Sequence, residues 1–172
     1  AGQGLLEVLI LLITQFFIAQ QEFLKNQAQP ADVHQLRICL RRLRSVLEFI
    51  GPEALEKYKT HQAQLRKIGQ NLGLLREIDV AYASWKEWSE CQPRGMVSKL
   101  TLGRTLLHRR VFEAEKVHGL FYAGYATPIL LELWATLITD NWKNTMTYQL
   151  TMEEYIKRHF SKWLKKLIKQ GK

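Results

Sequence analysis

The segment from Val33 to Ile50 constrains the fold most strongly, because it has the pattern of an amphipathic α-helix. Apolar residues recur every three or four positions, which is the spacing of one helix face. These residues are Leu36, Leu40, Leu43, Leu47 and Ile50. A stripe of this kind is stable only when other elements cover it. The sequence therefore predicts a helix that packs into a core along one face and carries polar residues elsewhere.

Another face of the same helix carries basic residues at intervals of three and four positions. This basic ladder consists of His34, Arg37, Arg41 and Arg44, with Arg42 beside it. Like charges at this spacing destabilise a helix by about 0.2–0.5 kcal/mol per pair, and Glu48 comes too late to neutralise them. Such a ladder either holds an anion or is a solvated basic face. The helix alone leaves both interpretations open.

The distribution of charge narrows the classes of partner. The chain has 172 residues and a formal net charge of +9, which implies nucleic acid, a membrane surface or a phosphate polymer. Residues 34–76 carry nine Lys and Arg against three Asp and Glu, and residues 151–172 carry seven against two. The positive charge is therefore concentrated around the ladder and at the C-terminal segment.

The remaining pattern is helical throughout, without an alternating segment that would indicate a strand. Breaks at Gly69 and Gly73 and at the prolines divide the chain into segments. The expected helices cover about 3–26, 30–50, 52–70, 74–88, 96–122, 126–139 and 151–169. Most connections between them are short, which favours antiparallel neighbours. The sequence predicts an all-α fold, an antiparallel bundle of about seven helices in a single domain over residues 1–172.

The apolar run from Leu5 to Ile18 is interpreted as a buried first helix rather than a transmembrane segment. It contains Glu7 and is shorter than the roughly 20 residues that span a bilayer. The two cysteines, Cys39 and Cys91, form no ligand-spaced cluster, and Cys39 borders the apolar stripe. A reduced, cytoplasmic setting is the resulting expectation.

Sequence signatures of catalysis are weak. The chain has no phosphate-binding G-x-x-x-x-G-K-[ST] loop, no H-E-x-x-H and no G-x-S-x-G. No two of its five histidines lie three or four positions apart, so one helix cannot supply a local metal site. We expect no enzyme activity, no catalytic residue, no metal and no cofactor.

A second motif, L-G-x-x-R-[DE]-x-D-V, covers Leu72 to Val80. It follows the pattern H-x-x-R-x-x-x-R-R-x-R of the ladder helix by some thirty residues. Together the two motifs resemble the CHAD family, and a looser likeness extends over Leu100 to Leu137. The resemblance implies a bundle of antiparallel helices with a basic groove or pore. It also implies binding of inorganic polyphosphate, with phosphate or sulfate ions as smaller ligands of the same site.

The resemblance also implies which side chains face the phosphates. They are His34, Arg37, Arg41, Arg42 and Arg44 in the first motif and Arg66, Lys67 and Arg76 in the second. Lys67 is offset by one position from the usual basic residue, and Glu77 stands where the family usually has Asp. We expect Asp79 to form a salt bridge with Arg76 or Arg37, whether to orient an arginine or simply to tie two helices together.

The C-terminal segment repeats the spacing of the basic ladder. Together with Arg109, its residues are candidates for an extension of the phosphate track: His159, Lys162, Lys166 and Lys169. Members of the family usually have two related halves, so we interpret this segment as the end of a first half. The chain is then a fragment, a natural truncation, or a half that pairs with another copy as a homodimer. A degenerate second motif and a basic amphipathic helix at a membrane surface are the alternatives.

Arginine suits a polyphosphate ligand because its planar group meets phosphate oxygens in pairs and stays charged. The predicted function is non-catalytic binding of polyphosphate in the cytoplasm, with association with polyphosphate granules. Histidine has a reference pKa near 6.5, so a phosphate-facing His34 predicts tighter binding at pH 6 than at pH 8. A nucleic-acid-binding domain without sequence specificity, a membrane-surface or scaffolding module, and an enzyme acting on phosphate chains are the alternatives.

Overall fold

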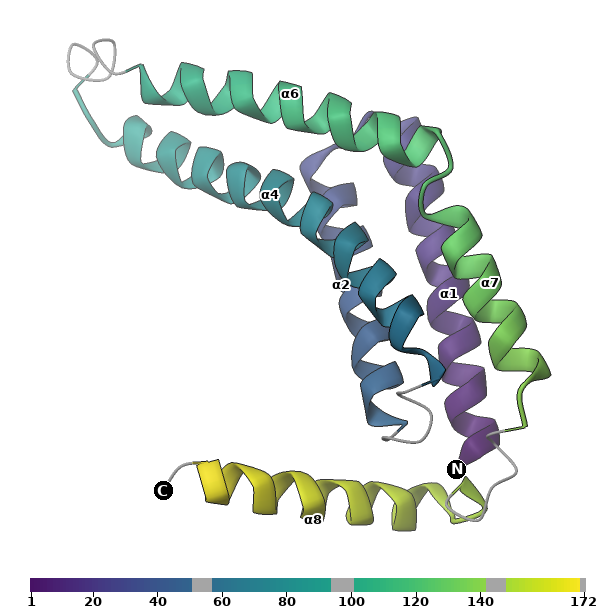
Figure 1. Cartoon of the computed structure of the whole chain (residues 1–172). Coiled ribbons are helices and arrows are strands. Elements are labelled where there is room, and N and C mark those ends of the chain that lie inside the picture. Colours follow the sequence, from purple (N-terminus) through teal and green to yellow (C-terminus); the bar gives the residue numbers. More distant parts are fainter. Residues whose placement is uncertain (51–56, 94–100, 142–147, 171–172) are drawn as a thin grey trace.

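The computed structural model describes residues 1–50, 57–93, 101–141 and 148–170, without the side chains of residues 162, 163, 166, 167 and 170. Within these residues the chain forms six α-helices and no strand (Figure 1). The helices are α1 (Gly2–Lys25), α2 (Pro30–Phe49), α4 (Lys59–Glu90), α6 (Leu102–Tyr122), α7 (Thr127–Thr139) and α8 (Met152–Gln170). The predicted all-α class and helical bundle are confirmed.

One boundary predicted from the sequence is wrong. Gly69 and Gly73 do not end a helix, because α4 runs without interruption from Lys59 to Glu90. Glycine in a helix interior costs about 1 kcal/mol relative to alanine, but the helix is held in place by buried side chains on both sides of the glycines. These are Leu65, Ile68, Leu72 and Leu75. The expected helix starts at 52–56 and 96–100 lie outside the described residues.

The apolar stripe of α2 is buried as predicted. Each of its five residues is at most 2% exposed: Leu36, Leu40, Leu43, Leu47 and Ile50. Helices α1 and α4 both pack against α2 and contribute Phe16, Phe23 and Leu72 to the same core. The apolar stripe of α2 faces this core. The arginines of the basic ladder therefore lie on another face of α2, next to α4.

Helix α1 buries one face in the core through residues such as Leu9 and Phe16, as expected for a buried first helix. By length and composition alone it could also cross a membrane, as could α6 and α7 if they are counted as one bent span. The opposite face of α1 leaves Leu11 and Ile18 more than half exposed. The absence of a transmembrane segment therefore stays a prediction.

Helix α8 crosses the end of the bundle (Figure 1). A capping box lies at its start: the Glu154 amide donates to Thr151 Oγ1 at 3.2 Å, and the Thr151 amide donates to Glu154 Oε2 at 3.0 Å. The buried Tyr155 joins the helix to α2, because its hydroxyl donates to the carbonyl of Ile50 at 2.7 Å. The first turn of α8 is thus anchored on the C-terminal end of α2.

Candidate functional site

Helices α2 and α4 lie side by side and border an open groove of about 540 Å³. Four of the predicted phosphate-facing residues line this α2–α4 groove: Arg37, Arg41 and Arg44 from α2 and Arg66 from α4. The remaining lining residues are Leu40, Gly69, Gln70, Gly73, Leu74 and Glu77. Arginines from two helices thus face one open space, with Glu77 as the acidic residue among the lining side chains.

Two arginines of the groove have buried donors without a partner. Arg37 and Arg44 are half-buried, while Arg41 and Arg66 are exposed. Arg37 Nη1 and Arg44 Nε are shielded from solvent and form no hydrogen bond with any residue that the structure describes. Buried polar side-chain atoms in folded proteins nearly always have a partner. Arg37 and Arg44 therefore each have a donor whose hydrogen-bonding capacity no described residue of the protein uses.

Gly69 and Gly73 lie one helical turn apart on α4 and form what we call the glycine floor of the groove. A Cβ at Gly73 would lie 3.2 Å from Arg37 Nη1, so glycine lets this guanidinium approach the α4 backbone. A Cβ at Gly69 would meet no atom within 4 Å. Sequence reasoning missed this floor because it interpreted both glycines as helix breaks. Their spacing of four positions was the available signal.

The other predicted phosphate-facing residues of the two motifs lie outside the lining of the groove. His34, Arg42 and Lys67 are exposed on the surfaces of α2 and α4, and Arg76 is half-buried on α4. Arg109 is exposed on α6. The structure thus divides the predicted set into four arginines that line one groove and residues outside its lining.

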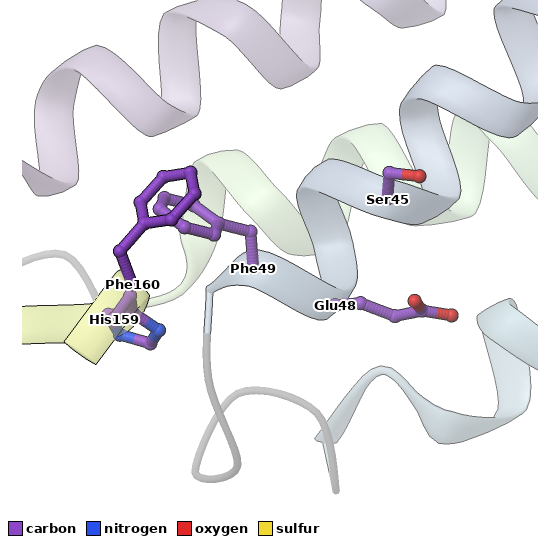
Figure 2. Close-up of a pocket in the computed structure, with 5 residues that line it drawn as sticks. All are labelled: Ser45, Glu48, Phe49, His159 and Phe160. Carbon is purple, nitrogen blue, oxygen red and sulfur yellow. The ribbon is translucent and has the colours of Figure 1, made fainter. Parts of the chain in front are cut away.

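Of the predicted C-terminal extension, Lys169 is exposed on α8, and the side chains of Lys162 and Lys166 lie outside the described residues. His159 lies in a different pocket, of about 430 Å³, between the end of α2 and α8 (Figure 2). Its ring centroid is 4.3 Å from that of Tyr155 and 5.0 Å from that of Phe49.

The walls of this second pocket are mostly apolar. Phe49 and Phe160 contribute apolar rings, and Ser45 and Glu48 complete the lining (Figure 2). The Glu48 carboxylate repels an anion, and among the lining side chains the Ser45 hydroxyl and the His159 ring are the groups that can donate to phosphate oxygens. The structure places His159 among aromatic side chains, apart from the arginines of the α2–α4 groove.

Asp79 has a different partner from the one expected. Arg110 Nε donates to its Oδ1 at 2.7 Å, so the expected salt bridge with Arg76 or Arg37 is replaced by one from α6. Burial raises the pKa of Asp79 above its ordinary value, while the charges of Arg110 and Arg76 oppose that shift. Arg110 was not among the partners predicted for Asp79 from the sequence. Asp79 therefore ties helices together and does not line the groove.

The described part of the chain contains no group of three His, Cys, Asp or Glu residues that could hold a metal ion. Among known proteins, no curated protein and no solved structure matches the sequence. A family model does: that of the CHAD domain matches residues 12–172. The chain therefore belongs to the CHAD domain family, which is known for polyphosphate binding and generally consists of binding domains rather than enzymes.

Proposed function

We propose that this protein binds inorganic polyphosphate in the α2–α4 groove without acting on it as an enzyme. The observation that carries the proposal is the convergence of Arg37, Arg41 and Arg44 from α2 with Arg66 from α4. The unpartnered donors of Arg37 and Arg44 support it further. Membership of the CHAD domain family points to the same ligand.

The chemistry of polyphosphate matches this arrangement. The polymer carries roughly one negative charge per phosphate and has no base edges that could be read by shaped polar pockets. A binder therefore needs several charge-assisted donors in a row. Hydrogen bonds to charged groups contribute about 1.5–3 kcal/mol each, so a few arginine contacts outweigh the repulsion along the ladder.

The residues around the groove extend its positive field in this proposal. His34 and Arg42 on α2 and Lys67 and Arg76 on α4 attract the parts of a long polymer that leave the groove. Arg109 on α6 and Lys169 on α8 do not line the groove, and in this proposal they contact only long chains. We therefore expect affinity to rise with chain length until the polymer covers the outer residues.

The proposal is tested by competition at fixed salt between long-chain polyphosphate, duplex DNA and RNA. Displacement of a fluorescent polyphosphate by unlabelled polyphosphate at much lower concentration than by either nucleic acid is the expected result. Affinity should also fall steeply as salt increases, because a linear polyanion releases counterions on binding. Equal affinities for polyphosphate, duplex DNA and RNA at matched charge would instead mean that the protein is a general binder of polyanions.

We also propose a cytoplasmic location at polyphosphate granules and self-association through apolar surface. The homodimer is supported by Leu11 and Ile18 on α1 and Leu131 and Ile138 on α7, which are each between 45% and 58% exposed. Light scattering after size-exclusion chromatography should give twice the mass of one chain. A fluorescent fusion of the protein should coincide with stained polyphosphate granules, and the Arg41→Glu substitution should disperse the fluorescence away from the granules.

A further inference from the structure

We infer that the glycine floor selects a single, unbranched polyanion chain that lies directly against α4. This inference rests on the proposed function and specifies the shape of the ligand. Glycine destabilises a helix interior relative to alanine, because the unfolded chain gains more freedom. The presence of two glycines one turn apart within α4 is therefore explained either by packing within the fold or by contact with the ligand.

The fold does not supply that reason at Gly69. A Cβ built there would meet nothing within 4 Å, so alanine would fit the protein without displacing any atom. The position lines the groove, so a side chain there would project into the space between the arginines. What glycine preserves at this position is the depth of the groove.

The arginines define what that depth admits. Arg37, Arg41 and Arg44 lie along one wall and Arg66 along the other, so a narrow chain on the floor can meet guanidinium groups from both sides. The position of Arg37 also depends on the glycine floor, because its guanidinium group approaches the α4 backbone where Gly73 has no side chain. A polyphosphate chain is narrow enough to use these contacts.

A nucleic-acid duplex is different, because its phosphates lie on the outside of a wide cylinder. It would contact only the exposed arginines at the rim, Arg41 and Arg66, and would not reach the floor. Filling the floor should therefore weaken binding of polyphosphate while leaving the weak binding of a duplex unchanged.

The test compares wild type, Gly69→Ala and Gly69→Leu for affinity to long-chain polyphosphate and to duplex DNA at the same salt, together with Tm. Gly69→Ala should raise Tm by about 2–4 °C and weaken polyphosphate binding severalfold. Gly69→Leu should weaken it at least tenfold. Affinity for the duplex should stay within twofold in both variants. Weaker binding by a protein that has become more stable identifies a ligand role for the glycine.

Gly119 provides a matched control. It lies inside α6, its Cβ would also meet nothing within 4 Å, and it is not among the residues that line the α2–α4 groove. Gly119→Ala should raise Tm similarly and leave polyphosphate affinity unchanged. The inference is overturned, while the proposed function stands, if wild type binds polyphosphate and Gly69→Leu binds it equally well. It is also overturned if Gly69→Leu loses affinity for duplex DNA by the same factor as for polyphosphate. Failure of wild type to bind polyphosphate would overturn both.

Discussion

Arg110 Nε donates a hydrogen bond to Asp79 Oδ1 at 2.7 Å and so joins α6 to α4 through a pair that is 16% and 1% exposed. The same guanidinium donates through Nη2 to the carbonyl of Ala28 at 2.9 Å. Ala28 has a φ of +59°, a left-handed conformation that is unfavourable for a residue with a side chain. One arginine thus holds α4, α6 and the loop that leads into the ladder helix.

Arg110→Met should lower the free energy of unfolding by about 3 kcal/mol, because the Asp79 carboxylate would remain buried without its partner. Burial already raises the pKa of Asp79, and loss of Arg110 raises it further. A carboxyl whose pKa is higher in the folded than in the unfolded state costs stability above that pKa, and the cost disappears as pH falls through it. Urea denaturation should show a deficit that is largest at neutral pH and shrinks on acidification.

The control for this prediction removes both charges. The double variant Asp79→Leu/Arg110→Met leaves no buried carboxylate, so it should recover much of the lost stability and show no pH-dependent deficit. A deficit in Arg110→Met that is the same at every pH would show that the arginine acts through packing alone, which would contradict the prediction.

Arg41→Glu should weaken polyphosphate binding by at least about tenfold, because one charge-assisted contact contributes about 1.5–3 kcal/mol and the new carboxylate repels the ligand. The helical circular dichroism signal should not change, since Arg41 is exposed. Arg104→Glu, at an exposed position on α6, makes the same change in net charge. Equal losses in the two variants, measured by fluorescence anisotropy, would mean that only total charge matters.

Glu77→Gln should strengthen polyphosphate binding by about twofold to fivefold, or ~0.4–1 kcal/mol, which is the size of an exposed charge interaction. Glu77 lines the groove together with the arginines, so its carboxylate repels a phosphate chain there. Glutamine keeps the size of the side chain and removes the charge. Titration calorimetry at low and high salt should show a gain that diminishes as salt screens the repulsion. An unchanged affinity at low salt would place the ligand away from Glu77.

Polyphosphate binding should tighten between pH 8 and pH 6 if His34, which is exposed one turn before Arg37, contacts the ligand. A neutral histidine at a phosphate site becomes a cation when it binds a proton, and histidine is the residue type that does so near neutral pH. His34→Ala should show a flatter pH dependence than wild type, whereas His108→Ala, at an exposed position on α6, should keep it. The same slope in wild type and His34→Ala would exclude His34 from the site.

The faces of α2 could be predicted from the sequence because they depend on local geometry. A helix repeats every 3.6 residues, so the spacing of Leu36, Leu40 and Leu43 determines that they share a face. The spacing of Arg37, Arg41 and Arg44 does the same for the ladder. The end of α7 at Thr139 and the capping box of α8 were predictable for the same reason, since their signals lie within a few residues of each other.

Local propensity failed at Gly69 and Gly73, where burial of neighbouring leucines in the shared core keeps α4 continuous. The predicted salt-bridge partner of Asp79 was wrong because Arg110 is 31 positions away and contacts Asp79 only when α6 packs on α4.

By itself the sequence determined a helical protein with a basic ladder on the surface of one amphipathic helix, because periodicity and charge are properties of a single segment. Only the tertiary structure decided that Arg66 lies across a groove from the ladder and that two glycines form its floor. The physical reason is that contacts between helices depend on how their buried faces pack, and no spacing within one helix contains that information.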